Sequence, residues 1–260
     1  MKQVAVVKGE VRRTVEEAKN YWLQTITNII STIIFFLGFS FVISPDLRGS
    51  DLFLLVSMLL WYFSLEIINQ MSHYILEEKY FGTIEKIFLS PYGPVTVLSY
   101  RAFSSILLST GIVSVMYLGL SLIVGISPFS ITLPMILISI VTLAGLYGFG
   151  LMLAGLTLLS SRTSSVSSII TYVMLFISGM LVPLDQFHPV IAAIARLFPL
   201  TNGVEMLRVI ATSNMDLLGF ILNINTYFGI VYSIVAIIAG ILVFKYAVRR
   251  AKIKGVLRSV

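Results

Sequence analysis

Long runs of apolar residues constrain this chain more than any other feature of its sequence. A membrane-spanning helix needs about 20 mainly apolar residues, and the chain offers six candidate spans, at about 21–43, 52–73, 102–126, 131–159, 166–184 and 220–248. Only 12% of its 260 residues are charged, about half of the roughly 25% of a typical soluble domain. We therefore predict an all-α membrane protein, with one transmembrane domain over residues 1–260, rather than a soluble protein with a large apolar core.

Basic residues divide unevenly between the two sides that six spans define. Fifteen of the 18 lysines and arginines fall on the side that carries both termini, and three (Arg48, Arg196 and Arg208) fall on the other. Because cytoplasmic loops are enriched in Lys and Arg, we predict a multi-pass protein of the cell membrane with cytoplasmic termini. The first twenty residues are polar and lack the apolar core of a signal peptide, so we expect the first span to stay as an anchor.

An amphipathic pattern precedes the first span, over residues 10–22. Apolar side chains recur there at helical spacing, at Val11, Val15, Ala18 and Trp22, and charged residues fill the other faces. A helix of this kind is too charged to span a membrane and is typical of one lying in its surface. We predict an interfacial helix with Tyr21 and Trp22 at the level of the headgroups; the alternative is a solvated helical extension.

A proline-rich segment at 183–219 separates the fifth span from the last. It contains an apolar run at 187–198 that is too short to cross a bilayer core of ~30 Å, followed by a second short helical pattern at 202–211. Pro189 and Pro199 punctuate the segment, and Glu205 and Arg208 stand at i, i+3, a spacing that lets side chains pair on a helix. We predict an outer re-entrant helical hairpin, since an ordinary surface loop would be more polar.

Several chemistries are excluded by residues that are missing. The chain has no cysteine, so it can form neither a disulfide nor a thiolate metal site. It contains no G-x-x-x-x-G-K-[ST] phosphate loop, no H-E-x-x-H and no G-x-S-x-G. The Glu77–Glu78 pair could belong to an intramembrane metalloprotease, but Gly82 stands where the arginine of that pattern would be. His73 and His188 have no ligand-spaced carboxylates, so we expect no catalytic residue, metal or cofactor on this chain.

The loop at 77–101 carries the most informative local pattern. Gly82 and Thr83 are typical of a helix start, with Thr83 as N-cap, and Pro91 ends the helix. The apolar residues within it, Ile84, Ile87 and Phe88, share one face, and Glu85 lies off that face. The pattern predicts a short amphipathic helix on the cytoplasmic side. Its apolar face would either dock into a groove on another protein or pack onto its own membrane domain.

One polar stripe interrupts the second span. Glu66 lies about two turns from the cytoplasmic end, and Asn69, Gln70 and His73 follow at i+3, i+4 and i+7. A carboxylate at that depth costs about 2.5–3.5 kcal/mol on insertion scales, so it should face protein or water. We consider two interpretations: the stripe lines a translocation path or its gate, or it is a structural polar cluster at the end of the span.

The fourth span is rich in small residues. Ala144 and Gly148, and Gly150 and Ala154, form small-xxx-small pairs that permit close approach of helices. We interpret this face as a packing surface.

Two segments resemble one known family. The pattern E-x-x-x-G-T-I-E-x-x-x-L-S-P from Glu78 to Pro91 resembles the cytoplasmic coupling region of type-2 permeases of ATP-binding-cassette (ABC) exporters. The stretch from Ile177 to Arg208 is similar to the same family's segment before the last span. The interfacial helix, the six spans and the cytoplasmic termini match as well, so the resemblance covers nearly the whole chain.

The resemblance implies a transport subunit that does no covalent chemistry itself. Two permease copies, as a homo- or heterodimer, would pair with two ATPase subunits that hold the ATP and Mg. The residues 83–89, with Gly82, would dock on the ATPase, and replacing Ile84 or Glu85 should weaken that association without unfolding the membrane domain. The alternative function is an ion-coupled secondary transporter or channel with Glu66 as its coupling site, although the internal repeats typical of such folds are not evident.

Overall fold

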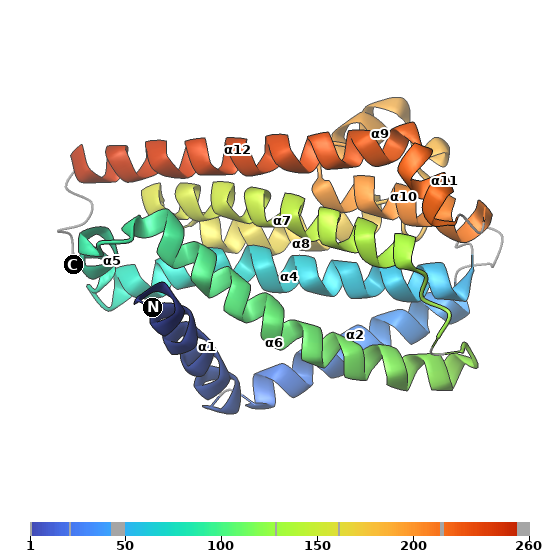
Figure 1. Ribbon diagram of the computed structural model, residues 1–260, viewed down its shortest axis with the longest axis horizontal. Helices are drawn as coiled ribbons and strands as arrows, with labels where there is room; N and C mark the ends of the chain where they lie inside the picture. Colours follow the sequence, from blue (N-terminus) through green and yellow to red (C-terminus); the bar gives the residue numbers. More distant parts are fainter. Residues whose placement is uncertain are drawn as a thin grey trace.

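Every regular element of the described chain is a helix in the computed structural model (Figure 1). The structure describes residues 2–20, 22–42, 50–127, 129–160, 162–213 and 216–253. Its long helices are α1 (Lys2–Asn20), α2 (Trp22–Val42), α4 (Asp51–Tyr80), α6 (Gly93–Val124), α7 (Leu133–Leu159), α8 (Thr163–Ile177), α10 (Pro199–Ser213) and α12 (Ile224–Ile253). Its short elements are α5 (Ile84–Leu89), a 3-10 turn (Leu184–Gln186), α9 (Pro189–Ala195) and α11 (Leu217–Leu222).

Helices α4, α7, α8 and α12 run side by side, and they give the bundle two distinct ends (Figure 1). The beginning of α1, the helix α5 and the end of α12 lie at one end, and α9, α10 and α11 lie at the other (Figure 1). We call these the α5 end and the hairpin end. Among the described residues, four helices are long and apolar enough to cross a membrane, namely α4, α6, α7 and α12, and the number reaches six if two bent helix pairs are each taken as one span. The prediction of an all-α membrane protein is confirmed.

The two bent pairs fall where the sequence predicted special helices. Gly9–Asn20 and Thr25–Phe41 lie at 77° to each other, so α1 turns away from the direction of α2. Pro189–Ala195 and Pro199–Ser213 lie at 103° and form what we call the α9–α10 hairpin. Tyr21 lies outside the described residues, and Trp22 is exposed.

Helix α4 is the centre of the bundle, buried on nearly every side from Phe53 to Ser64. It packs against α6, α7, α8 and α10. The indole nitrogen of Trp61 donates a hydrogen bond to the carbonyl oxygen of Thr171 in α8 at 2.8 Å. The first half of α4 therefore supplies much of the apolar core of the bundle.

The small residues of α7 allow two helices to approach it closely, which confirms the packing interpretation. A Cβ placed on Gly148 would lie 2.4 Å from the carbonyl carbon of Ala236 in α12, and one on Gly240 would lie 2.1 Å from the oxygen of Gly148. On another face, a Cβ on Gly150 would lie 2.9 Å from the sulfur of Met71 in α4. Backbone therefore packs directly on backbone between α7 and α12.

Several helix boundaries differ from those predicted. Helix α4 continues to Tyr80 instead of ending near residue 73, and α6 begins at Gly93 instead of near 102, so most of the predicted loop is helical. Helix α8 ends at Ile177, short of residue 184, because Gly179 adopts a positive φ of 84° that turns the chain. The predicted sixth span begins inside α11, which ends at Leu222 and is separate from α12.

Candidate translocation path and coupling region

The polar stripe of α4 is tied to two neighbouring helices. The amide nitrogen of Gln70 donates to a Glu66 carboxylate oxygen at 2.7 Å, and the amide oxygen of Gln70 accepts a hydrogen bond from Ser105 of α6. Asn69 points elsewhere, since its side-chain oxygen accepts from Ser168 of α8 at 3.2 Å. The stripe therefore divides between two faces of α4.

Two cavities meet at this stripe. One of about 430 Å³ is bounded by residues of α2, α4 and α8, and one of about 770 Å³ is bounded by residues of α1, α2, α4 and α6. Five side chains line both: Asn28, Tyr62, Glu66, Gln70 and His73. Three of the four predicted stripe residues thus stand where the two cavities adjoin, and Asn69 lines the smaller one. Both volumes fall in the range of about 300–1,000 Å³ that is usual for ligand sites.

The carboxylate of Glu66 accepts a hydrogen bond and also borders both cavities. Its partner Gln70 satisfies one carboxylate oxygen, and the cavities give the carboxylate room for water or a polar ligand. A carboxylate in a membrane span needs such surroundings. The geometry fits a path lining, and it also contains the polar contacts of a structural cluster.

Aromatic side chains form one wall of the smaller cavity. The ring of Trp61 in α4 contacts Phe35 of α2 and Tyr172 of α8, with centroids 6.0 and 6.1 Å apart. Trp61 itself is buried, and the other two rings are partly exposed. The sequence did not single out Asn28, Phe35 or Tyr172, because no spacing within one helix reveals a contact between three helices.

The predicted short helix after Gly82 and Thr83 is present as α5. Thr83 occupies the N-cap position of α5 in a helical conformation, and its side chain makes no capping bond. Its hydroxyl instead donates to the Glu78 carboxylate at the end of α4. Thr83 is thus the N-cap residue of α5, as predicted, but its side chain does not form the capping bond. The tight turn into α5 is made by Gly82, whose φ is 66°.

The apolar face of α5 points into its own domain. Ile84 and Ile87 are 3% and 7% exposed and belong to the main core cluster, packed against α4 and α6. Glu85 is exposed, as are Phe81 before the helix and Leu89 at its end. For Phe88 only the backbone is described. The surface that α5 offers to a partner is thus its polar side and its two ends.

A charge cluster joins α1 to the base of α5. Arg13 of α1 lies 3.6 Å from a Glu78 oxygen, and Arg101 of α6 lies 3.5 Å from a Glu10 oxygen. Both guanidinium groups lie over the ring of Tyr74, at 5.6 and 4.9 Å from its centroid, a distance typical of cation–π contacts. Since Glu78 also accepts from Thr83, one set of contacts connects α1, α4, α6 and the entry to α5.

The charged residues of the α9–α10 hairpin have other partners than their spacing suggested. Glu205 lies 3.6 Å from Arg196, across the bend of the hairpin. Arg208 donates to the carbonyl oxygen of Gly179 at 2.7 Å and lies over the ring of Phe53 at 4.4 Å. In this described part of the chain, Glu205 and Arg208 do not form an ion pair with each other.

The prolines of the hairpin mark its helix starts, and the bend that they flank contacts two long helices. Pro189 begins α9, and Pro199 begins α10, positions where the missing N–H costs little. A Cβ placed on Gly145 of α7 would lie 3.0 Å from Pro199, and the hydroxyl of Tyr232 in α12 donates to the carbonyl oxygen of Leu197. The bend is thereby held against α7 and α12.

Comparison with known proteins agrees with this arrangement. The family model described as ABC-2 type transporter matches residues 4–212, a range that contains the stripe of α4, the helix α5 and the hairpin. No curated protein matches the sequence. Because the family model covers most of the chain, the resemblance seen in the sequence is confirmed, and the chain belongs to the ABC-2 type transporter family as a multi-pass membrane permease.

Proposed function

We propose that this chain is the membrane-spanning permease subunit of an ATP-driven exporter, which forms the translocation path as a dimer and is coupled to a separate ATPase subunit. Family membership makes it the transport subunit of an ABC transporter. The direction of transport, the dimer, the ATPase and the cytoplasmic location of the termini are the proposed parts. In this proposal ATP and Mg bind to the partner ATPase chain.

The observation that carries the proposal is that α5 is buried in its own domain on one side and exposed on the other. This helix lies at the end of the bundle (Figure 1), anchored by the buried Ile84 and Ile87 while Glu85 faces outward. Because α5 packs against α4 and α6, a partner protein that displaces α5 from its exposed side would transmit the displacement to these two spans. The contacts from Thr83 to Glu78 and from Glu78 to Arg13 would transmit the same displacement to α1.

The translocation path that this displacement would open consists of the two adjoining cavities at Glu66. Its walls come from five helices, α1, α2, α4, α6 and α8, and the charge cluster links three of them, α1, α4 and α6, to the start of α5. Exposed aromatic side chains beside it, among them Tyr172 and Phe176 of α8, offer a second copy an apolar face to cover. Two copies would then enclose the polar lining between them, and alternating access would follow from motion at their interface.

The α5 end is proposed to be cytoplasmic. It carries the beginning of α1 and the end of α12 (Figure 1), which belong to the basic side of the sequence. The positive-inside rule places such an end in the cytoplasm, where an ATPase subunit meets ATP. The hairpin end then faces outward.

Co-purification tests the proposal. The chain is expressed with the ATPase encoded next to it, extracted in mild detergent, and examined for a complex with equal amounts of both chains. Glu85→Arg should reduce the ATPase recovered by about tenfold, the loss expected for about 1.4 kcal/mol. Glu16→Arg is the matched control, because it makes the same charge change on an exposed residue of α1 away from α5.

Ile84 is not a suitable test position, contrary to the expectation from the sequence. A charge at this buried site would disturb the packing of α5 itself, so lost association would not distinguish docking from misfolding. If no ATPase accompanies the wild-type chain, or if Glu85→Arg keeps full recovery and full ATP-driven transport, the coupling proposal is refuted. In the first case ion-coupled transport through Glu66 becomes the function to test.

A further inference from the structure

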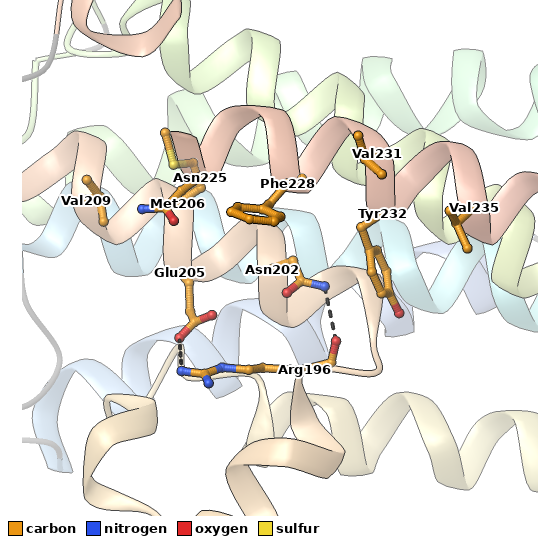
Figure 2. A pocket seen from close by; sticks show the side chains of 11 residues that line it. Arg196, Asn202, Glu205, Met206, Val209, Asn225, Phe228, Val231, Tyr232 and Val235 are labelled. Carbon is orange, nitrogen blue, oxygen red and sulfur yellow. Dashed lines mark hydrogen bonds and ion pairs between the residues drawn. The ribbon is translucent and has the colours of Figure 1, made fainter. Parts of the chain in front are cut away.

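A third cavity lies at the hairpin end, away from the polar stripe of α4. It has a volume of about 680 Å³ and is bounded by α10, α12 and the bend between α9 and α10 (Figure 2). None of its lining residues borders the cavities at Glu66. The proposed function leaves this cavity without a role.

One part of the cavity is charged with both signs. Arg196 and Glu205 approach to 3.6 Å, yet their side chains remain 61% and 38% exposed. The amide nitrogen of Asn202 donates to the carbonyl oxygen of Arg196 at 3.2 Å and fixes the backbone of the bend. Figure 2 shows the two charged ends meeting at the Asn225 end of the cavity. Lipid chains cannot solvate such charges, so this part of the cavity requires polar atoms.

Apart from Asn225 and Tyr232, the wall that α12 contributes to the cavity is apolar. Phe228, Val231 and Val235 line it along α12, and all three are more than half exposed. From Phe228 to Val235 the helix rises about 10 Å. The cavity therefore has a charged head region and an elongated apolar wall.

The depth of these two parts matches a bilayer. The 30 residues of α12 span about 45 Å, close to the 40–45 Å of a bilayer with its headgroups. In a bilayer that α12 crosses over its full length, Asn225 in the first turn would stand at the level of the headgroups, and Val235 would lie about 15 Å deeper. Such an orientation puts the charged pair at headgroup depth and the apolar wall at the depth of the acyl chains.

We propose that this cavity binds a phospholipid with a zwitterionic headgroup from the leaflet at the hairpin end. The phosphate interacts with Arg196, the ammonium group with Glu205, and one acyl chain lies along Phe228 and Val235. A neutral pair of opposite charges matches a zwitterion better than an anionic lipid, which would leave Glu205 facing a negative charge. The inference does not depend on coupling to an ATPase.

Native mass spectrometry of the purified chain tests the site. The chain is exposed to an equal mixture of phosphatidylethanolamine and phosphatidylglycerol, and the retained lipids are counted. The wild type should retain phosphatidylethanolamine preferentially, and Arg196→Gln should lower that adduct by about tenfold, as expected for one lost charge-assisted hydrogen bond. Glu205→Gln should shift the preference toward phosphatidylglycerol, because it leaves Arg196 as an unbalanced positive charge.

Two further variants separate a lipid site from a structural ion pair. Val235→Trp fills the apolar part without touching either charge, so it should also remove the adduct while the elution volume stays unchanged. Arg12→Gln combined with Glu16→Gln removes an exposed pair of 2.8 Å on α1 and should leave lipid retention as in the wild type. Equal retention of both lipids by the wild type, the same change of preference in both single variants, or an intact adduct in Val235→Trp would overturn the proposal.

Discussion

Replacing Gly148 with alanine is expected to weaken the bundle more than any other single added methyl group on α7. The new Cβ would lie 2.4 Å from the carbonyl carbon of Ala236 and 2.5 Å from its oxygen. Non-bonded carbon atoms are usually about 3.5–4.0 Å apart, so α7 and α12 would have to separate locally by about 1 Å. The obstructing atoms are backbone atoms of a long helix, which no rotamer change can move aside.

The size of the effect follows from this geometry. Overpacking a core costs about 1–3 kcal/mol, and we expect the upper part of that range because two helices must move. For a chain of this size the apparent unfolding temperature should fall by roughly 5–10 °C. The measurement is the fraction of monodisperse chain that remains after heating in detergent, compared at one heating rate because unfolding is irreversible under such conditions.

Two other glycines provide graded controls. A Cβ on Gly119 of α6 meets nothing within 4 Å, and one on Gly150 meets the end of the flexible Met71 side chain at 2.9 Å. Gly119→Ala should therefore leave the unfolding temperature unchanged or raise it slightly, and Gly150→Ala should lower it less than Gly148→Ala. If Gly148→Ala were as stable as Gly119→Ala, the close contact between α7 and α12 would not exist as described.

Three further outcomes follow from contacts described above. Trp61→Phe removes the hydrogen bond to Thr171 and should cost about 1 kcal/mol, measured by the same heating assay; an unchanged temperature would contradict the buried contact. A double-mutant cycle of Arg101→Gln and Glu10→Gln should give a coupling energy of about 0.5–3 kcal/mol, and additive effects would argue against the ion pair. Glu66→Gln keeps the size of the side chain but removes its charge, so transport should fall while the ATPase still co-purifies; full transport would leave the residue a structural role.

The spans were predictable because burial in a bilayer leaves its mark within each helix. Apolar runs identify α4, α6, α7 and α12 without any knowledge of their neighbours. Boundaries were less predictable, since residues 74–80 contain polar side chains that a span would exclude and yet continue α4. Hydropathy predicts which residues cross the membrane, but it does not predict how far the helix continues beyond the apolar residues.

Side-chain partners were the least predictable part of the site. The spacing of Glu205 and Arg208 favoured a pair on one helix, but Arg196 approaches Glu205 from across a bend that local spacing does not encode. The pattern of Ile84 and Ile87 showed that they share a face, and only the positions of α4 and α6 determine that this face points inward. The two cavities at Glu66 likewise depend on the packing of five helices, α1, α2, α4, α6 and α8, which spacing within one helix does not encode.

The close contact between α7 and α12 also bears on how the protein is made. Gly148 and Gly240 face each other, but α8 to α11 are synthesised between them. During translation the glycine-rich face of α7 is therefore in the membrane before α12 is available, and it contacts lipid or other helices in the meantime. Assembly of this pair can be complete only after α12 has left the ribosome and entered the bilayer, so this close contact forms later than the contacts between α7 and the helices that precede it.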